Sequence, residues 1–90
     1  MITNKEKTDL EKRSRRIIGQ IEGVSRMISD GKYCIDIVNQ IHAARRALDK
    51  LGLIIIENHV KTCVKNKLTS KNGSKNIIEE LTQTLDQFLR

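Results

Sequence analysis

The sequence predicts an all-α fold in which one protomer contains three helices and the central helix is unusually long. Apolar residues recur three or four positions apart in three stretches of the chain, which is the spacing of amphipathic helices. The 90 residues contain no proline, and no stretch alternates apolar and polar residues as a strand would. We expect the three helices to form a single domain over residues 1–90.

The first helix is expected over about residues 5–29. Asp30 and Gly31 should end it, because glycine readily adopts the left-handed backbone conformation that commonly closes a helix. The apolar positions of this helix, which follow one another at intervals of three, four or seven, are Leu10, Ile17, Ile21, Val24 and Ile28.

The second helix is expected from Tyr33 to Leu68, because the apolar spacing continues there without a break. A helix of about 36 residues would be roughly 54 Å long at a rise of about 1.5 Å per residue. That length exceeds what a compact protomer of this size can cover. We therefore expect a second chain to cover much of this helix.

The third helix is expected after a polar loop at residues 69–74. Ser74 is a suitable N-cap, because its hydroxyl can accept a hydrogen bond from the first turn. The apolar positions of this short helix are Ile78, Leu81, Leu85 and Phe88.

Composition excludes several classes of protein. The longest apolar run, Leu53 to Ile56, is far shorter than the roughly 20 residues that cross a membrane. The N-terminus lacks the apolar core of a signal peptide, so we expect the chain to stay in the cytoplasm. The chain has no glycine-rich phosphate loop, nucleophile motif or suitably spaced carboxylate pair, so we do not expect an enzyme.

The chain is basic, with a net charge of +6 and a pI near 9.6. Basic residues exceed acidic ones over 1–33 and again over 34–68, and they cluster at positions 12–13, 15–16 and 45–46. A basic helical surface of this kind is typical of proteins that bind DNA or RNA. The chain has no helix-turn-helix, so we expect the helical surface itself to contact the nucleic acid. The alternative is that these residues form ordinary solvated helix faces. The candidate phosphate contacts are Arg13, Arg16, Arg45, Arg46 and Lys50.

Three of the four cysteines and histidines, Cys34, His59 and Cys63, form a candidate metal site. His59 and Cys63 are four residues apart, which places both side chains on one face of a helix. Cys34 precedes His59 by 25 residues, or roughly 37 Å of helix, so one chain cannot bring all three together. If two long helices pack antiparallel, Cys34 of one chain falls beside His59 and Cys63 of its partner.

The donor atoms indicate which metal this site would hold. The cytoplasm keeps thiols reduced, so two cysteines are better explained as metal ligands or redox sensors than as a disulfide. Thiolate and imidazole suit Cu(I) and zinc, but a closed structural zinc site normally has four protein ligands. The hypothesis we favour is therefore a trigonal Cu(I) site with two sulfur ligands and one nitrogen ligand. The alternative is that both cysteines are core thiols and that His59 is a surface histidine.

Three segments of the chain resemble the copper-sensing operon repressor (CsoR) family. They are Arg16-Ile-Ile-Gly19-Gln20-Ile-Glu-Gly23, Tyr33-Cys34-Ile-Asp36 and Asn58-His59-Val-Lys-Thr-Cys63, within a likeness that covers roughly residues 10–90. The resemblance implies an antiparallel dimer that assembles into a disc-shaped dimer of dimers. It also implies that Cys34 of one subunit binds Cu(I) together with His59 and Cys63 of the other.

Relatives in this superfamily respond to nickel or cobalt, formaldehyde or persulfide, and the resemblance implies a different ligand pattern for each. The nickel and cobalt branch has an extra N-terminal histidine and a histidine in place of the second cysteine. The formaldehyde branch lacks the second cysteine, and the persulfide branch lacks the histidine. This chain has Cys34, His59 and Cys63, so Cu(I) is the best match. Two thiols can also react with sulfur species, which leaves a thiol- or persulfide-responsive repressor as the alternative.

The resemblance implies a repressor that binds operator DNA when metal-free and that Cu(I) releases, which derepresses genes for copper export. Among the basic residues, family correspondence falls best on Arg13 and Lys50. Tyr33 and Glu79 match positions that connect the ligating imidazole to neighbouring helices. A cytosolic copper buffer without a DNA role is an alternative of another class, and the basic charge speaks against it.

Overall fold

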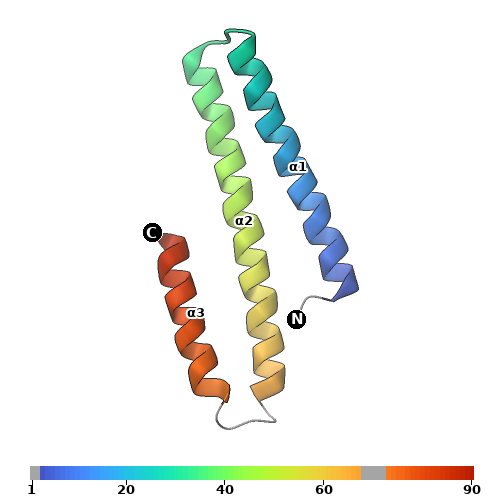
Figure 1. Ribbon diagram of the computed structural model, residues 1–90, viewed down its shortest axis with the longest axis vertical. Helices are drawn as coiled ribbons and strands as arrows, with labels where there is room; N and C mark the ends of the chain where they lie inside the picture. The colour runs from blue at the N-terminus through green and yellow to red at the C-terminus, as the bar shows by residue number, and fades with distance from the viewer. Residues whose placement is uncertain (1–2, 68–72) are drawn as a thin grey trace. The chain divides into compact units, whose positions relative to one another are not determined.

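The computed structural model describes residues 3–67 and 73–90, with side chains described at 3–61 and 78–90. These ranges contain three helices and no strand: α1 (Asn4–Ser29), α2 (Cys34–Lys67) and α3 (Gly73–Leu89) (Figure 1). The predicted all-α, three-helix protomer is confirmed, and the first two helices end close to the expected positions. None of the described helices is both long and apolar enough to span a membrane.

The start of α1 is fixed by a reciprocal pair of hydrogen bonds. The backbone N–H of Glu6 donates to the Thr3 hydroxyl (3.2 Å), and the backbone N–H of Thr3 donates to the Glu6 carboxylate (3.0 Å). This capping box satisfies two backbone donors that the helix itself leaves unpaired.

The end of α1 is a Schellman-type turn. The N–H of Gly31 donates to the carbonyl of Ile28 (3.1 Å), and the N–H of Lys32 donates to the carbonyl of Met27 (3.0 Å). Gly31 has a φ of +66°, the left-handed conformation that this turn requires. The expected end of the helix at Asp30 and Gly31 is therefore confirmed.

Contacts divide the chain into two compact units, residues 2–54 and residues 55–90. In the first unit, α1 and the first part of α2 lie side by side and antiparallel (Figure 1). Only three apolar side chains of the described residues are buried: Leu10, Ile17 and Ala44.

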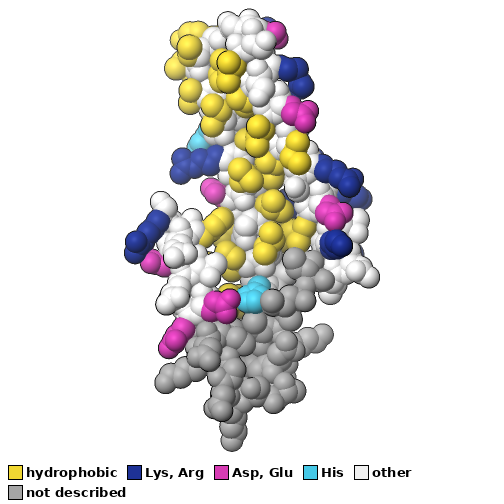
Figure 2. All heavy atoms as spheres, in the orientation of Figure 1, with side chains coloured by type: hydrophobic (Ala, Val, Ile, Leu, Met, Phe, Trp, Pro, Cys, Tyr) yellow, Lys and Arg dark blue, Asp and Glu magenta, His cyan; other side chains and the backbone are white. Residues whose placement is uncertain are grey.

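Many large apolar side chains of the first unit are exposed. Figure 2 shows hydrophobic side chains gathered over the face in view. Contiguous apolar surface of this kind usually marks a contact with another protein. This agrees with the expectation that a second chain covers part of the long helix α2. The exposed apolar residues of this unit include Ile18, Ile21, Ile28, Ile35, Val38, Ile41 and Leu48.

In the second unit, α3 runs antiparallel beside the last part of α2 (Figure 1). Leu81 and Leu85 are half-buried positions of α3. The helix begins at Gly73, so Ser74 is its second residue and the expected N-cap at Ser74 is wrong. Glycine has a low helix propensity, which suggested a loop at this position, but propensity is a weak constraint that packing overrides.

Candidate metal centre and basic cleft

Cys34 stands at the exposed start of α2. It is the first residue of the helix, and its side chain is exposed. The carbonyl of the preceding residue, Tyr33, accepts a hydrogen bond from the N–H of Ile37 (3.1 Å), which closes the first turn. The Tyr33 side chain is 68% exposed. Both side chains are thus accessible to another chain at this end of α2.

His59 lies in the later part of the same helix and is half-buried. Cys63 also belongs to α2, but its side chain lies outside the described residues. Because α2 runs through both positions without a break, their four-residue spacing places them on one face of the helix. The structure therefore contains the continuous helix on which His59 and Cys63 were predicted to share a face.

A single chain does not bring Cys34 and His59 together. Both lie in α2, with 25 residues of continuous helix between them, or roughly 37 Å at the helical rise. Among the described side chains, which do not include Cys63, no three His, Cys, Asp or Glu groups form a cluster that could hold a metal ion. The thiol and imidazole donors still match a soft metal ion in their chemistry. A second chain is needed to close such a site.

Glu79, the expected partner of the imidazole, is an exposed residue of α3. His59 and Glu79 belong to the same unit, in which α3 lies beside the last part of α2 (Figure 1). A carboxylate on a neighbouring helix is the usual acceptor for the second ring nitrogen of a metal-bound histidine. Tyr33 instead adjoins Cys34, so it would reach a ligating histidine only on another chain. Both roles stay predictions.

Basic residues of α1 line a cleft within the first unit. The cleft has a volume of about 330 Å³, and the residues that line it are Asp9, Lys12, Arg13, Arg16 and Ile54. The structure therefore brings together Arg13 and Arg16, two of the five candidate phosphate contacts.

The other three candidates, Arg45, Arg46 and Lys50, are exposed on α2 and do not line this cleft. Lys12 was not among the candidates, although it lines the cleft. Its sequence signal is the position four residues before Arg16, which places both side chains on one face of α1.

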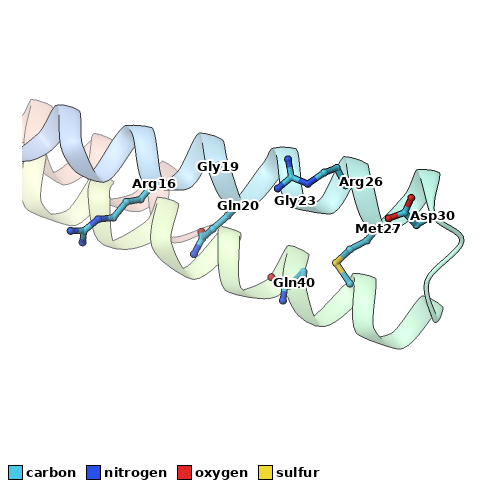
Figure 3. A pocket seen from close by; sticks show the side chains of 8 residues that line it. All are labelled: Arg16, Gly19, Gln20, Gly23, Arg26, Met27, Asp30 and Gln40. Carbon is cyan, nitrogen blue, oxygen red and sulfur yellow. The ribbon is translucent and has the colours of Figure 1, made fainter.

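A second, more open groove of about 670 Å³ lies along α1 (Figure 3). Apart from the neighbouring residues and the backbone of α1 itself, nothing lies within 4 Å of the place where a Cβ would stand at Gly19, so the surface of the helix is open there. The residues that line the groove are Arg16, Gly19, Gln20, Gly23, Arg26, Met27, Asp30 and Gln40.

The chain has clear sequence relatives. Residues 6–87 match the profile of the family described as metal-sensitive transcriptional repressor. The copper-sensing transcriptional repressor CsoR of Bacillus subtilis (strain 168) is 35% identical over 88 residues, which cover 98% of this chain and 86% of that protein. The similarity therefore extends over both the candidate metal ligands and the basic cleft.

Solved structures of similar chains have the same fold. The copper-sensing repressor CsoR with Cu(I) from Geobacillus thermodenitrificans NG80-2 gives a TM-score of 0.88 at 36% identity, over 100% of this chain and 95% of that chain. The nickel-responsive transcriptional regulator InrS gives a TM-score of 0.80 at 31% identity, over 90% of each chain. Since both similar chains have this fold, the fold alone does not identify the metal.

Proposed function

Because this chain belongs to the family of metal-sensitive transcriptional repressors, we propose that Cu(I) is the signal to which it responds. The family consists of repressors and not of enzymes, so the chain is a metal-responsive transcriptional repressor whose partner is operator DNA. Similar chains include a copper sensor and a nickel-responsive regulator. The donor side chains therefore decide the choice of metal.

The donor set of Cys34, His59 and Cys63 carries this proposal. The two thiolates are soft donors, which favour Cu(I) over nickel, and the imidazole is a donor that copper also accepts. A closed zinc site would normally require a fourth protein ligand. The nickel branch is expected to have a histidine at position 63 and another near the N-terminus, whereas this chain has Cys63 and no histidine before His42.

Antiparallel pairing of two α2 helices would complete the site. Cys34 of one chain would then lie beside His59 and Cys63 of the other, and the twofold symmetry would create two equal sites per dimer. The exposed apolar residues of α1 and α2 supply surface for such an interface. Two dimers would assemble into the tetramer that the family resemblance implies.

Regulation needs two states of the assembly that differ in their affinity for DNA. When Cys34, His59 and Cys63 hold Cu(I) between two chains, His59 would be drawn toward Glu79 and the basic surface would fit the operator less well. Such a coupling is typically about 1–3 kcal/mol and is reciprocal, so DNA weakens Cu(I) binding by the same factor. Genes for copper export are the expected targets.

A thiol- or persulfide-responsive repressor of the same family is the second candidate, and the exposure of Cys34 favours it. A small-molecule persulfide would transfer its outer sulfur to the thiolate of Cys34 and leave as a thiol. The thiolate of Cys63 of the partner chain would then attack Cys34, which forms the disulfide and releases hydrogen sulfide. A copper buffer without a DNA role has no such support, because the family is one of transcriptional repressors.

Anaerobic metal competition tests the choice of metal. The metal-free protein is titrated with Cu(I), Zn(II) and Ni(II) against a coloured chelator, and the Cu(I)-loaded protein is then measured by X-ray absorption. We expect the tightest binding for Cu(I), with two sulfur neighbours and one nitrogen neighbour. His42→Ala removes the histidine outside the donor set and should bind Cu(I) like the wild type. Tighter binding of Ni(II), or Cu(I) with only nitrogen and oxygen neighbours, would contradict the proposal.

A further inference from the structure

We infer that Arg45 of one chain and Asp49 of a second copy form an ion pair, and that this pair fixes the register in which Cys34 meets the donors of the partner chain. The inference rests on the proposed function and deepens it, because it names the residues that position the two halves of the metal site. It also places Arg45 at the contact between chains and not among the phosphate contacts.

Arg45 shares one face of α2 with the two cysteines. The helix is continuous from Cys34 to Lys67 and has about 3.6 residues per turn. Arg45 follows Cys34 by 11 residues and precedes Cys63 by 18 residues, which are about three and five whole turns. The side of α2 that carries the cysteines therefore carries Arg45 as well.

Asp49 stands one turn beyond Arg45, and both side chains are exposed. Large apolar side chains lie beside them on the helix. Ile41, one turn before Arg45, is 48% exposed, and Leu48, next to Asp49, is 47% exposed. A second chain that covers these apolar residues also removes water from the two charges, and a charge that loses its water needs a partner.

Arg45 and Asp49 of the same chain do not pair with each other. No ion pair joins them among the side chains that the structure describes, although they are four positions apart. The order of the charges agrees with this finding, because a helix favours an acidic residue four positions before a basic one over the reverse order. Both charges are therefore available to a second chain.

The metal site sets the register of two antiparallel α2 helices. If Cys34 lies opposite position 61 of the partner chain, midway between the other two donors, the twofold axis crosses the pair near Ala47. Arg45 and Asp49 lie two residues before and two residues after Ala47. Arg45 of each chain therefore falls opposite Asp49 of the other chain, to within about 1.5 Å along the helix.

The two charges also fall on the same side of the contact line between the helices. Arg45 and Asp49 are displaced from Cys34 by about 20° and about 60° in one direction around α2. The twofold axis is perpendicular to the two helices, so it relates each side of the contact line to the same side of the partner. The guanidinium of Arg45 then adjoins the Asp49 carboxylate, which it can bind as a planar fork.

The same residues oppose other arrangements of the two helices. A parallel pair in register would place Arg45 beside Arg45 and Asp49 beside Asp49, and like charges held together repel. The antiparallel pair instead contains two ion pairs, one from each combination of the two chains. The charges thus favour the arrangement that completes the metal site and disfavour one that does not.

The test reverses one charge in each of two chains. Dimers of Arg45→Asp alone bring acidic residues together, and dimers of Asp49→Arg alone bring basic residues together. A mixed dimer regains two ion pairs between the chains, whereas mixing restores no pair within one chain. Glu57→Arg is the control for Asp49→Arg, because Glu57 is an exposed residue of α2 about 140° around the helix from Cys34.

Equal amounts of the two variants are refolded together from urea without metal, and native mass spectrometry measures the chain composition of the assemblies. We expect each variant alone to dimerise at least about tenfold more weakly than the wild type. Arg45→Asp mixed with Asp49→Arg should form assemblies with equal numbers of both chains. In the mixture of Arg45→Asp with Glu57→Arg, the Glu57→Arg chains should pair with one another.

Random mixing of Arg45→Asp with Asp49→Arg would overturn the inference, as would wild-type dimerisation of either variant alone. Circular dichroism checks folding. If a charge reversal prevents folding, Arg45→Gln and Asp49→Asn replace the two variants. Their mixed dimer keeps one ion pair and dimers of either variant keep none, so the mixed dimer should predominate, and random mixing would again overturn the inference.

Cu(I) titration of the same samples shows whether the ion pair positions the metal site, because every variant keeps all three donors. The mixed dimer should bind two Cu(I) ions with wild-type affinity. Preferred mixed dimers that lack this affinity would overturn the role in register. If only the inference is wrong, both variants alone bind Cu(I) as the wild type does. If the proposed function is wrong, the wild type itself does not prefer Cu(I), whatever the composition of the mixed assemblies.

Discussion

Cys34 is the first residue of α2, and His59 lies 25 residues further along the same continuous helix. Roughly 37 Å of helix therefore separates them, whereas nitrogen and sulfur ligands of a metal such as zinc lie only about 2.0–2.3 Å from the ion. If these two side chains bind one ion, they must come from different chains. The first prediction tests this consequence.

Mixed dimers of Cys34→Ala chains with His59→Ala chains should regain one intact metal site per dimer. Each mixed dimer keeps one combination of Cys34 with the partner chain's His59 and Cys63, whereas dimers of either variant alone keep none. Cu(I) titration of dimers isolated through two different affinity tags measures the number of sites. Wild-type Cu(I) affinity in either variant alone would show that the ligands are wrongly assigned.

Cys34→Ala and Cys63→Ala should each lose Cu(I) affinity and yet retain DNA binding. Loss of an outer partner of a ligand typically costs 10–100-fold in affinity, so loss of a ligand itself should cost at least about 100-fold. DNA binding should persist because both substitutions leave the basic residues of the cleft unchanged. Competition with a chelator measures the Cu(I) affinity, and fluorescence anisotropy with labelled DNA measures the DNA affinity. Loss of DNA binding in the metal-free variants would instead indicate that the cysteines stabilise the fold.

His59→Ala and Glu79→Ala should separate metal binding from release of DNA. His59→Ala removes one donor and the link to α3, so weak Cu(I) binding through two thiolates should survive without DNA release. Glu79→Ala should weaken the response with little loss of Cu(I), while Glu80→Ala, an exposed neighbour on α3, serves as the control. DNA titrations with and without Cu(I) give the coupling free energy for each variant. Wild-type coupling in both variants would rule out a route through these two residues.

Gly31→Ala and Gly19→Ala should change stability in opposite directions. Gly31 has a φ of +66°, which costs a residue with a side chain about 1 kcal/mol. Gly19 lies inside α1, and an added Cβ would meet nothing within 4 Å apart from its neighbouring residues and the backbone of α1, so alanine should stabilise the helix by about 0.5–1 kcal/mol. Urea denaturation at equal protein concentrations measures both changes. Destabilisation by Gly19→Ala would indicate that another chain packs closely against this part of α1.

The helices could be predicted from the sequence because their signals are local. The apolar spacing gave α1 and α2, and Gly31 gave the turn between them. The capping box of Thr3 and Glu6 was missed, although its Thr-x-x-Glu pattern is visible in the sequence. The N-cap of α3 was wrongly assigned to Ser74, because serine and glycine are both common at helix starts. In the structure, Gly73 and Ser74 are the first two residues of the helix.

The candidate metal ligands were apparent from the sequence because cysteine and histidine are rare in this chain and chemically distinctive. The grouping of the basic residues was less apparent. Helical spacing relates Lys12 to Arg16, but the cleft exists because Ile54 of α2 lies against this face of α1. That contact joins residues far apart in the chain, and no local pattern in the sequence encodes it.

Release of DNA by Cu(I) tests the central claim most directly. The metal-free protein is bound to a fluorescein-labelled duplex that it has itself selected from a random-sequence pool, and Cu(I) is added without oxygen. At a protein concentration just sufficient to saturate the DNA, the anisotropy should fall toward the value of free DNA and level off near one Cu(I) per chain, while Ni(II) and Zn(II) leave the complex intact and Cys34→Ala does not respond. DNA that stays bound at saturating Cu(I), or that Ni(II) releases equally well, would contradict the account.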